Sequence, residues 1–168
     1  GPMSNTASFR EDININSIPS ADELVGALNA LDVPFLSGGV KRSKTLPPAQ
    51  LMAGLAIQRD ARMRLALIPL LLSRPDFAPS AVLEANSSLS GVGAFNLRLF
   101  YTAAMLLQES YKLKLDKLLG QREPLPDLFG EKLAITPIGG PATRLKELGE
   151  RHKALIGVRA NWVGTYHH

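Results

Sequence analysis

Apolar residues recur at helical spacing along most of the chain, and alternating strand patterns are almost absent. Leu24, Leu28 and Leu31 follow the i, i+4, i+7 spacing that places side chains on one face of a helix. Ser20 precedes this stripe, and Glu23 comes three residues after Ser20, which is the arrangement of a capping box. We therefore predict a helix that begins after Ser20 and packs through one apolar face.

Proline and glycine divide the remaining chain into further helices. They delimit four segments that we predict to be helical, residues 48–73, 80–89, 94–119 and 141–157. Pro69 removes a backbone hydrogen bond, so we expect it to kink or end the regular ladder of the first segment. Gly120 is placed to cap the third segment. The apolar run 65–72 is much shorter than the roughly 20 residues that a membrane-spanning helix needs, which favours a buried core segment.

The pattern predicts an all-α protein, an irregular bundle of four to five helices. We expect residues 20–157 to form one helical domain. Residues 1–19 are mostly polar and predict a flexible, extended arm, in which the two residues ahead of Met3 are typical of a remnant of protease cleavage. Residues 158–168 predict an extended C-terminal tail.

The composition fits a soluble protein with a sizeable core. The chain has 168 residues, 45% of them hydrophobic, which is enough for one domain. It contains no cysteine, so disulfides, thiolate metal sites and cysteine nucleophiles are excluded. The lack of cysteine and of a recognisable secretion or membrane signal favours a cytoplasmic location, and we expect no membrane association.

No catalytic pattern emerges from the sequence. The three histidines are His152, His167 and His168, and they do not form the set of three or four ligands that a metal site requires. The GxSxG and HExxH patterns of hydrolases and metalloproteases are missing. A glycine-containing loop before Lys41 lacks the spacing of a phosphate loop. We therefore predict a protein without catalytic residues, bound metal or cofactor.

Positive charge is concentrated in one stretch of the chain. Residues 41–64 contain six basic residues and one acid, whereas the net charge of the whole chain is only +4. One interpretation is a nucleic-acid-binding regulator that uses the basic segment 38–64, with Lys41, Arg42 and Lys44 contacting phosphates. A steep loss of binding with salt would support this alternative.

A helix-turn-helix is the form that such recognition would take. Residues 80–89 and the helix from residue 94 are separated by a glycine-containing turn. Asn96 and Arg98, near the start of the second helix, carry side chains that can read base edges. The residues that follow are strongly apolar, which favours a helix pair buried in the core instead.

The basic residues do not form a single stripe on a helical wheel. Arg59 and Arg62 share their side of the predicted helix with leucines and methionines, and Arg64 has Asp60 as a local partner. A helix that is apolar on all sides is usually buried, with arginine stems lying along the apolar surface. This pattern moves the interpretation from nucleic acid towards a protein partner.

The tail carries the second indication of a protein partner. Trp162 and Tyr166 provide two large amphipathic rings near the end of the chain, a residue type enriched at interfaces. The alternative is a strap that folds back on its own bundle. We predict a non-enzymatic protein-binding helical subunit, a regulatory or antitoxin-like component that acts through a protein partner or self-association. Trp162, Tyr166, Arg59 and Arg62 are its predicted contacts.

Overall fold

The described part of the chain is entirely helical. The computed structural model describes residues 18–33, 45–130, 133 and 140–151, and these contain no strand. Their elements are α2 (Ala21–Ala30), α3 (Pro48–Ala56), α4 (Ala61–Leu65), α5 (Leu67–Ser73), the 3-10 turn η1 (Pro75–Phe77), α6 (Ser80–Ser88), α7 (Gly91–Ser110), α8 (Lys112–Leu119) and α9 (Pro141–Arg151). The all-α prediction is confirmed, with more helices than the four to five expected.

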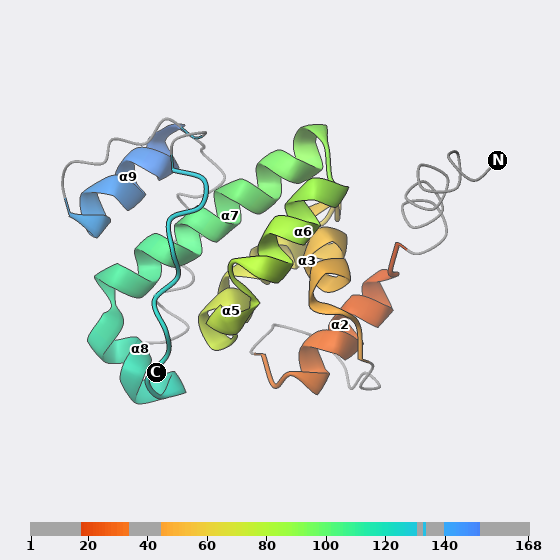
Figure 1. Cartoon of the computed structure of the whole chain (residues 1–168), viewed down its shortest axis with the longest axis horizontal. Helices are drawn as coiled ribbons and strands as arrows, with labels where there is room; N and C mark the ends of the chain where they lie inside the picture. The colour runs from red at the N-terminus through yellow and green to blue at the C-terminus, as the bar shows by residue number, and fades with distance from the viewer. Residues whose placement is uncertain (1–17, 34–44, 131–132, 134–139, 152–168) are drawn as a thin grey trace.

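The long helix α7 is the centre of the bundle (Figure 1). Helices α3, α5, α6 and α9 all pack against it. Its side chains are buried over most of its length, including every residue from Leu99 to Leu107. Helix α5 is buried on all sides from Leu67 to Leu72, so the apolar run predicted to be a core segment is one.

The predicted helix 48–73 is divided into three. The interruption at Ala66 lies one turn before Pro69, whose missing N–H leaves the Leu65 carbonyl without its helical donor. This is the break expected from Pro69. A second break, which the sequence pattern does not predict, separates α3 from α4 at residues 57–60. Asp60 stabilises it by accepting a hydrogen bond from the Arg62 backbone N–H (2.9 Å), as a helix N-cap does.

The Arg64 side chain also stabilises this second break. Its Nη1 donates to the carbonyl oxygens of Gln58 (2.6 Å) and Arg59 (2.8 Å). The expected partnership of Arg64 with Asp60 is wrong, because the Asp60 carboxylate caps α4 and lies 3.8 Å from Arg62. Arg64 therefore has backbone partners, two carbonyl groups of the turn between α3 and α4.

The helices predicted from capping signals begin and end close to the expected residues. Ser20 and Glu23 form both hydrogen bonds of the capping box, at 3.2 and 3.0 Å. Gly120 ends α8 with a positive φ of 79°, which favours glycine. The predicted helix 94–119 begins earlier, at Gly91, and is interrupted at Tyr111, so it forms α7 and α8.

After α8 the chain runs back along α7 (Figure 1), and we call residues 121–130 the return segment. The side-chain amide of Gln108 on α7 forms two hydrogen bonds with the return segment. Its Nε2 donates to the Glu123 carbonyl (2.9 Å), and its Oε1 accepts from the Leu125 N–H (2.7 Å). The Tyr101 hydroxyl donates to the Pro126 carbonyl (2.7 Å). Because all these anchors project from α7, the return segment is fixed to the centre of the bundle.

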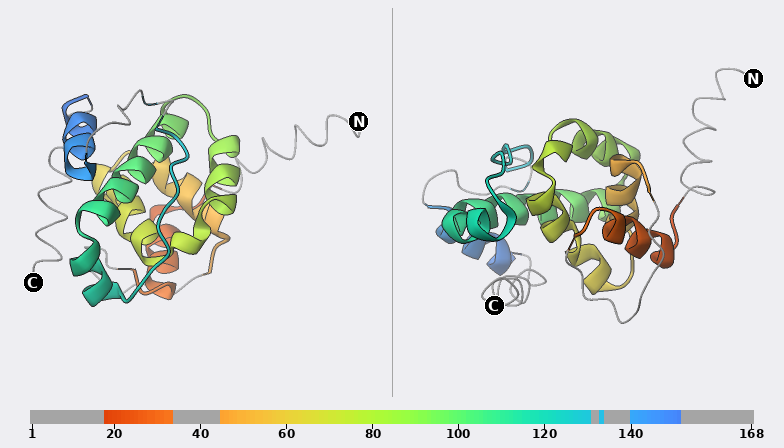
Figure 2. Two further views of the ribbon diagram at one scale, coloured as in Figure 1. Left: turned by 60° about the vertical axis from the view of Figure 1, so that its left-hand side comes forward. Right: turned by 90° about the horizontal axis from the view of Figure 1, so that it is seen from below.

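The return segment also helps to place α9, which packs on α7 at the end of the molecule opposite α2 (Figures 1 and 2). Leu145 and Leu148 are the buried residues of α9, and Arg144 pairs with Asp127 of the return segment at 3.4 Å. The helix begins at Pro141 as predicted. Its predicted end at Gly157, the predicted tail and nearly all of the predicted N-terminal arm lie outside the described residues.

Candidate functional site

A largely apolar groove lies between α3 and α6, and the residues that lead into α2 close one of its sides. We call it the α3–α6 groove. It has a volume of about 500 Å³. Its lining residues are Ile18, Pro19, Pro47, Ala49, Gln50, Ala53, Gly54, Ile57, Glu84, Ser88, Leu89 and Ser90.

Helical periodicity gives this groove its shape. Ala49, Ala53 and Ile57 are spaced by four residues and form one ridge of α3 and its C-terminal turn, and Glu84 and Ser88 have the same spacing on α6. Small side chains occupy the middle of the α3 ridge, which leaves the space open. At 1.5 Å per residue the ridge is roughly 12 Å long, or about two helical turns.

Gly54 allows the wall near α2 to approach α3 closely. A Cβ atom at this position would lie 2.9 Å from Leu24 Cδ2 and 3.2 Å from Pro19 Cδ. Leu24 is fully buried, and Cδ of a proline ring is bound to the backbone nitrogen, so neither neighbour can move easily. Glycine is therefore required here for packing, and it brings Ile18 and Pro19 beside α3.

Two of the apolar side chains that line the groove are exposed to solvent. Ile18 is 46% exposed and Ile57 is 39% exposed. Val92, next to Gly93 at the start of α7, is 75% exposed, and Gly93 lies directly against Ile57. Single exposed apolar residues are common on proteins, but their clustering around a concave surface is typical of a binding site.

The groove carries little charge. Among the described residues that line the groove, Glu84, which is exposed, is the one ionisable residue, and none is a lysine, an arginine or an aromatic residue. The remaining polar groups are those of Gln50, Ser88 and Ser90. The groove therefore offers an apolar floor with one carboxylate on its α6 wall.

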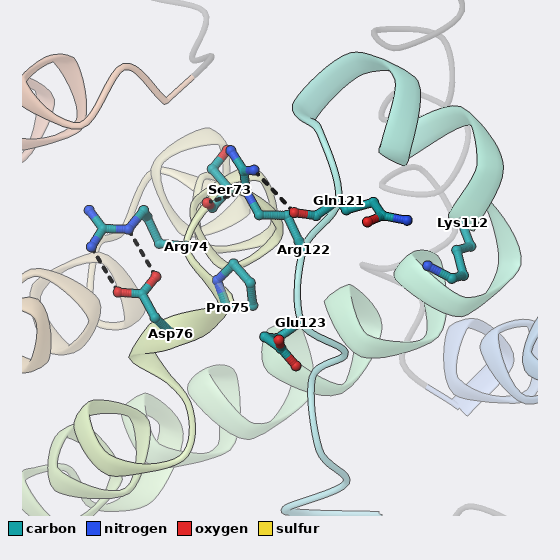
Figure 3. Close-up of a pocket in the computed structure, with 8 residues that line it drawn as sticks. All are labelled: Ser73, Arg74, Pro75, Asp76, Lys112, Gln121, Arg122 and Glu123. Atoms are coloured by element: carbon teal, nitrogen blue, oxygen red, sulfur yellow. Dashed lines mark hydrogen bonds and ion pairs between the residues drawn. The ribbon is translucent and has the colours of Figure 1, made fainter.

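A second cleft is lined mainly by charged and polar residues (Figure 3). It has a volume of about 650 Å³ and lies between the end of α5 with η1 on one side and the start of α8 with the return segment on the other. The residues that Figure 3 labels line it, Ser73, Arg74, Pro75, Asp76, Lys112, Gln121, Arg122 and Glu123.

Charges in this second cleft mainly compensate one another. Arg74 binds Asp76 with two hydrogen bonds of 2.9 and 2.8 Å, which hold the pKa of the Asp76 carboxyl below its usual value. Arg122 Nε donates to the Ser73 carbonyl (3.1 Å), and Lys112 pairs with Asp116 (3.0 Å). These contacts give the cleft a structural role in joining α5 to the return segment.

The residues predicted to contact a partner are only partly described. Arg59 and Arg62 are both exposed, in the turn between α3 and α4 and in α4. Arg59 follows Ile57 by two residues, which places it just beyond one end of the α3–α6 groove. Trp162 and Tyr166 lie outside the described residues, and their contact with a partner stays a prediction.

Two of the residues predicted for nucleic-acid contact make internal hydrogen bonds. Asn96 donates to the Ala56 carbonyl at the end of α3 (3.0 Å), and Arg98 donates to the Asn86 side chain on α6 (3.3 Å). Both residues are partly buried, and they connect α7 to α3 and α6. Lys41, Arg42 and Lys44, the other three, lie outside the described residues, so the nucleic-acid alternative stays a prediction.

The groove itself was not found from the sequence. Its residues come from three segments, at the start of α2, along α3 and around the end of α6. Two local signals were present, the apolar Ile18 two residues before the N-cap Ser20 and the small residues at a four-residue spacing in α3.

Within the described ranges, no three acidic or histidine side chains lie together in a way that would hold a metal ion. None of the helices in that part of the chain is both long enough and apolar enough to cross a bilayer. Comparison with models of protein families, with curated proteins and with solved structures gives no match.

Proposed function

We propose that this protein is a non-enzymatic helical subunit that binds another protein, and that the α3–α6 groove is its docking surface. The observation that carries the proposal is the groove itself, a concave, largely apolar surface whose α3 ridge is about two helical turns long and whose lining includes the exposed Ile18 and Ile57. A regulatory or antitoxin-like role would be exercised through such a contact.

The groove supplies part of the binding free energy. Fully burying an isoleucine contributes about 1.5–3 kcal/mol, and Ile18 and Ile57 are each a little under half exposed. Covering both therefore contributes about 2 kcal/mol, far less than the ~8 kcal/mol of a micromolar complex. The proposed anchors Trp162 and Tyr166, together with the exposed Arg59 and Arg62, would supply further contacts.

The nucleic-acid alternative has weaker support. Of the five residues predicted for it, the two that are described donate hydrogen bonds within the protein. Reading bases with either side chain would require breaking a contact between α7 and a neighbouring helix. The exposed arginines of the 57–64 region suit an acidic patch on a protein equally well.

Photo-crosslinking in cells of the source organism tests the protein-binding function. A benzophenone amino acid replaces Ser90, an exposed residue that lines the groove, and in a matched control it replaces Lys117, which is exposed on α8. We expect a discrete protein adduct from position 90 and none of the same mass from position 117. The crosslinked peptide identifies the partner.

Equal adducts at both positions, or none at either, would contradict the proposed function. A parallel chain that ends at Gly157 tests the predicted anchors in the tail. If Trp162 and Tyr166 contribute as proposed, the yield of the adduct from position 90 falls in the shortened chain.

A further inference from the structure

We infer that the occupant of the α3–α6 groove is a short amphipathic helix that carries a lysine or arginine opposite Glu84. This inference rests on the proposed function and specifies the chemistry of the partner. It follows from the shape and the charge of the groove, compared with the surface that each known mode of peptide recognition requires.

Most recognition modes do not fit this surface. Addition of a β-strand needs an exposed sheet edge, and no strand occurs among residues 18–33, 45–130 and 140–151. Proline-rich peptides dock on grooves lined with aromatic residues, and acidic or phosphorylated motifs need arginine clusters. The described lining residues include neither type. The mode that suits an apolar groove between two helices is a helix that lays its apolar face into the groove.

The dimensions of the groove fit a helix of about two to three turns. The ridge formed by Ala49, Ala53 and Ile57 is roughly 12 Å long. A partner helix aligned with it would place apolar side chains at i, i+4 and i+7 against the small residues of α3. The alanines leave room for these anchors, because only a methyl group projects at positions 49 and 53.

Charge sets the preference among such helices. The Glu84 carboxylate lies on the α6 wall and is exposed, and the described part of the lining contains no cation. Docking an apolar helix would remove water from this carboxylate, which is unfavourable unless the helix brings a cation. Arg59, just beyond Ile57, favours an acidic residue at that end of the partner.

Selection from a displayed library of random 14-residue peptides tests the inference on the full chain. The decisive variant is Ser88→Arg, which fills the groove from α6 and places an arginine four residues after Glu84, a spacing that stabilises a helix. Ser87→Arg is the matched control, since Ser87 is the exposed neighbour on α6 and does not line the groove. Glu84→Lys reverses the charge, and Glu109→Lys controls for net charge.

The inference predicts enriched peptides with apolar residues at i, i+4 and i+7 and a lysine or arginine at one fixed position. Their affinity should fall at least tenfold with Ser88→Arg and stay within twofold with Ser87→Arg. Selection on Glu84→Lys should enrich Asp or Glu at the fixed position, and selection on Glu109→Lys should not.

Several outcomes would overturn the inference. These are enriched peptides without helical spacing, a charge preference that Glu84→Lys leaves unchanged, equal affinity for Ser88→Arg, or no enrichment at all. A wild-type chain that sediments as a dimer and becomes monomeric with Ser88→Arg would assign the groove to a second copy instead. In each of these cases a specific adduct from position 90 would still support protein binding, so failure of this inference is separable from failure of the proposed function.

Discussion

At the scale of single residues, two glycines determine how closely the α3 region packs against its neighbours. Gly54 lies where Leu24 and the Pro19 ring press against α3, and Gly93 lies where Ile57 presses against α7. The two sites differ in their neighbours. Leu24 is buried in the core, whereas Ile57 is 39% exposed and can turn towards solvent.

This difference predicts effects of different size for the same substitution. Gly54→Ala should lower the free energy of unfolding by about 1–2 kcal/mol, because the added methyl group overpacks a closed site. Gly93→Ala should change it by less than about 0.5 kcal/mol, because the gain in helix propensity offsets a small movement of Ile57. Urea denaturation of both variants measures the difference. A Gly54→Ala variant as stable as the wild type would contradict the close packing of Pro19 on α3.

At the scale of elements, the return segment connects α7 to α9. Tyr101 is fully buried on α7, donates to the Pro126 carbonyl, and meets the Phe129 ring edge to face at 5.5 Å. Burial raises the pKa of the Tyr101 hydroxyl well above its usual value of 10.0, and the Asp127 carboxylate adds to the effect. The neutral hydroxyl is therefore the form that holds the return segment.

The raised pKa of Tyr101 predicts a loss of stability at high pH. Above about pH 10 the unfolded chain releases this proton while the folded chain retains it, so stability falls as the pH rises. Tyr101→Phe should be less stable than the wild type by about 1 kcal/mol at pH 7, because one hydrogen bond is lost. Each pH unit above 10 removes up to about 1.4 kcal/mol of the wild type's advantage. The difference in stability between the two proteins should therefore vanish near about pH 11 and change sign by about pH 11.5. Urea denaturation of both proteins across this pH range measures the difference. A difference that does not change with pH would contradict the raised pKa of Tyr101.

Helix boundaries were predictable where the signal is local. The capping box at Ser20 and Glu23, the terminal Gly120 and the effect of Pro69 all act within one turn of the residue concerned. The break at residues 57–60 and the interruption at Tyr111 contain neither proline nor glycine. At the first of these, Asp60 caps α4 and Arg64 binds the carbonyls of residues 58 and 59, and neither contact belongs to the proline and glycine signals used for the prediction.

At the scale of the whole molecule, the candidate site exists only after folding. The α3–α6 groove joins residues 18–19, 47–57 and 84–90, which no periodicity relates to one another. The sequence predicted a protein partner from the tail and the exposed arginines, and the proposal now centres on a surface it did not reveal. Glu84 shows why, since in the sequence it is an ordinary acid on a short helix.

The central claim is that this groove binds a helix from another protein. Two-dimensional ¹H–¹⁵N spectra of the full chain, recorded with increasing amounts of the most enriched peptide, test it most directly. We expect chemical-shift changes concentrated at Ala53, Ile57 and Ser88. The backbone signals of Arg74 and Arg122, which line the second cleft, should change little. Chemical-shift changes concentrated at the second cleft, or spread evenly over the molecule, would contradict binding in the α3–α6 groove.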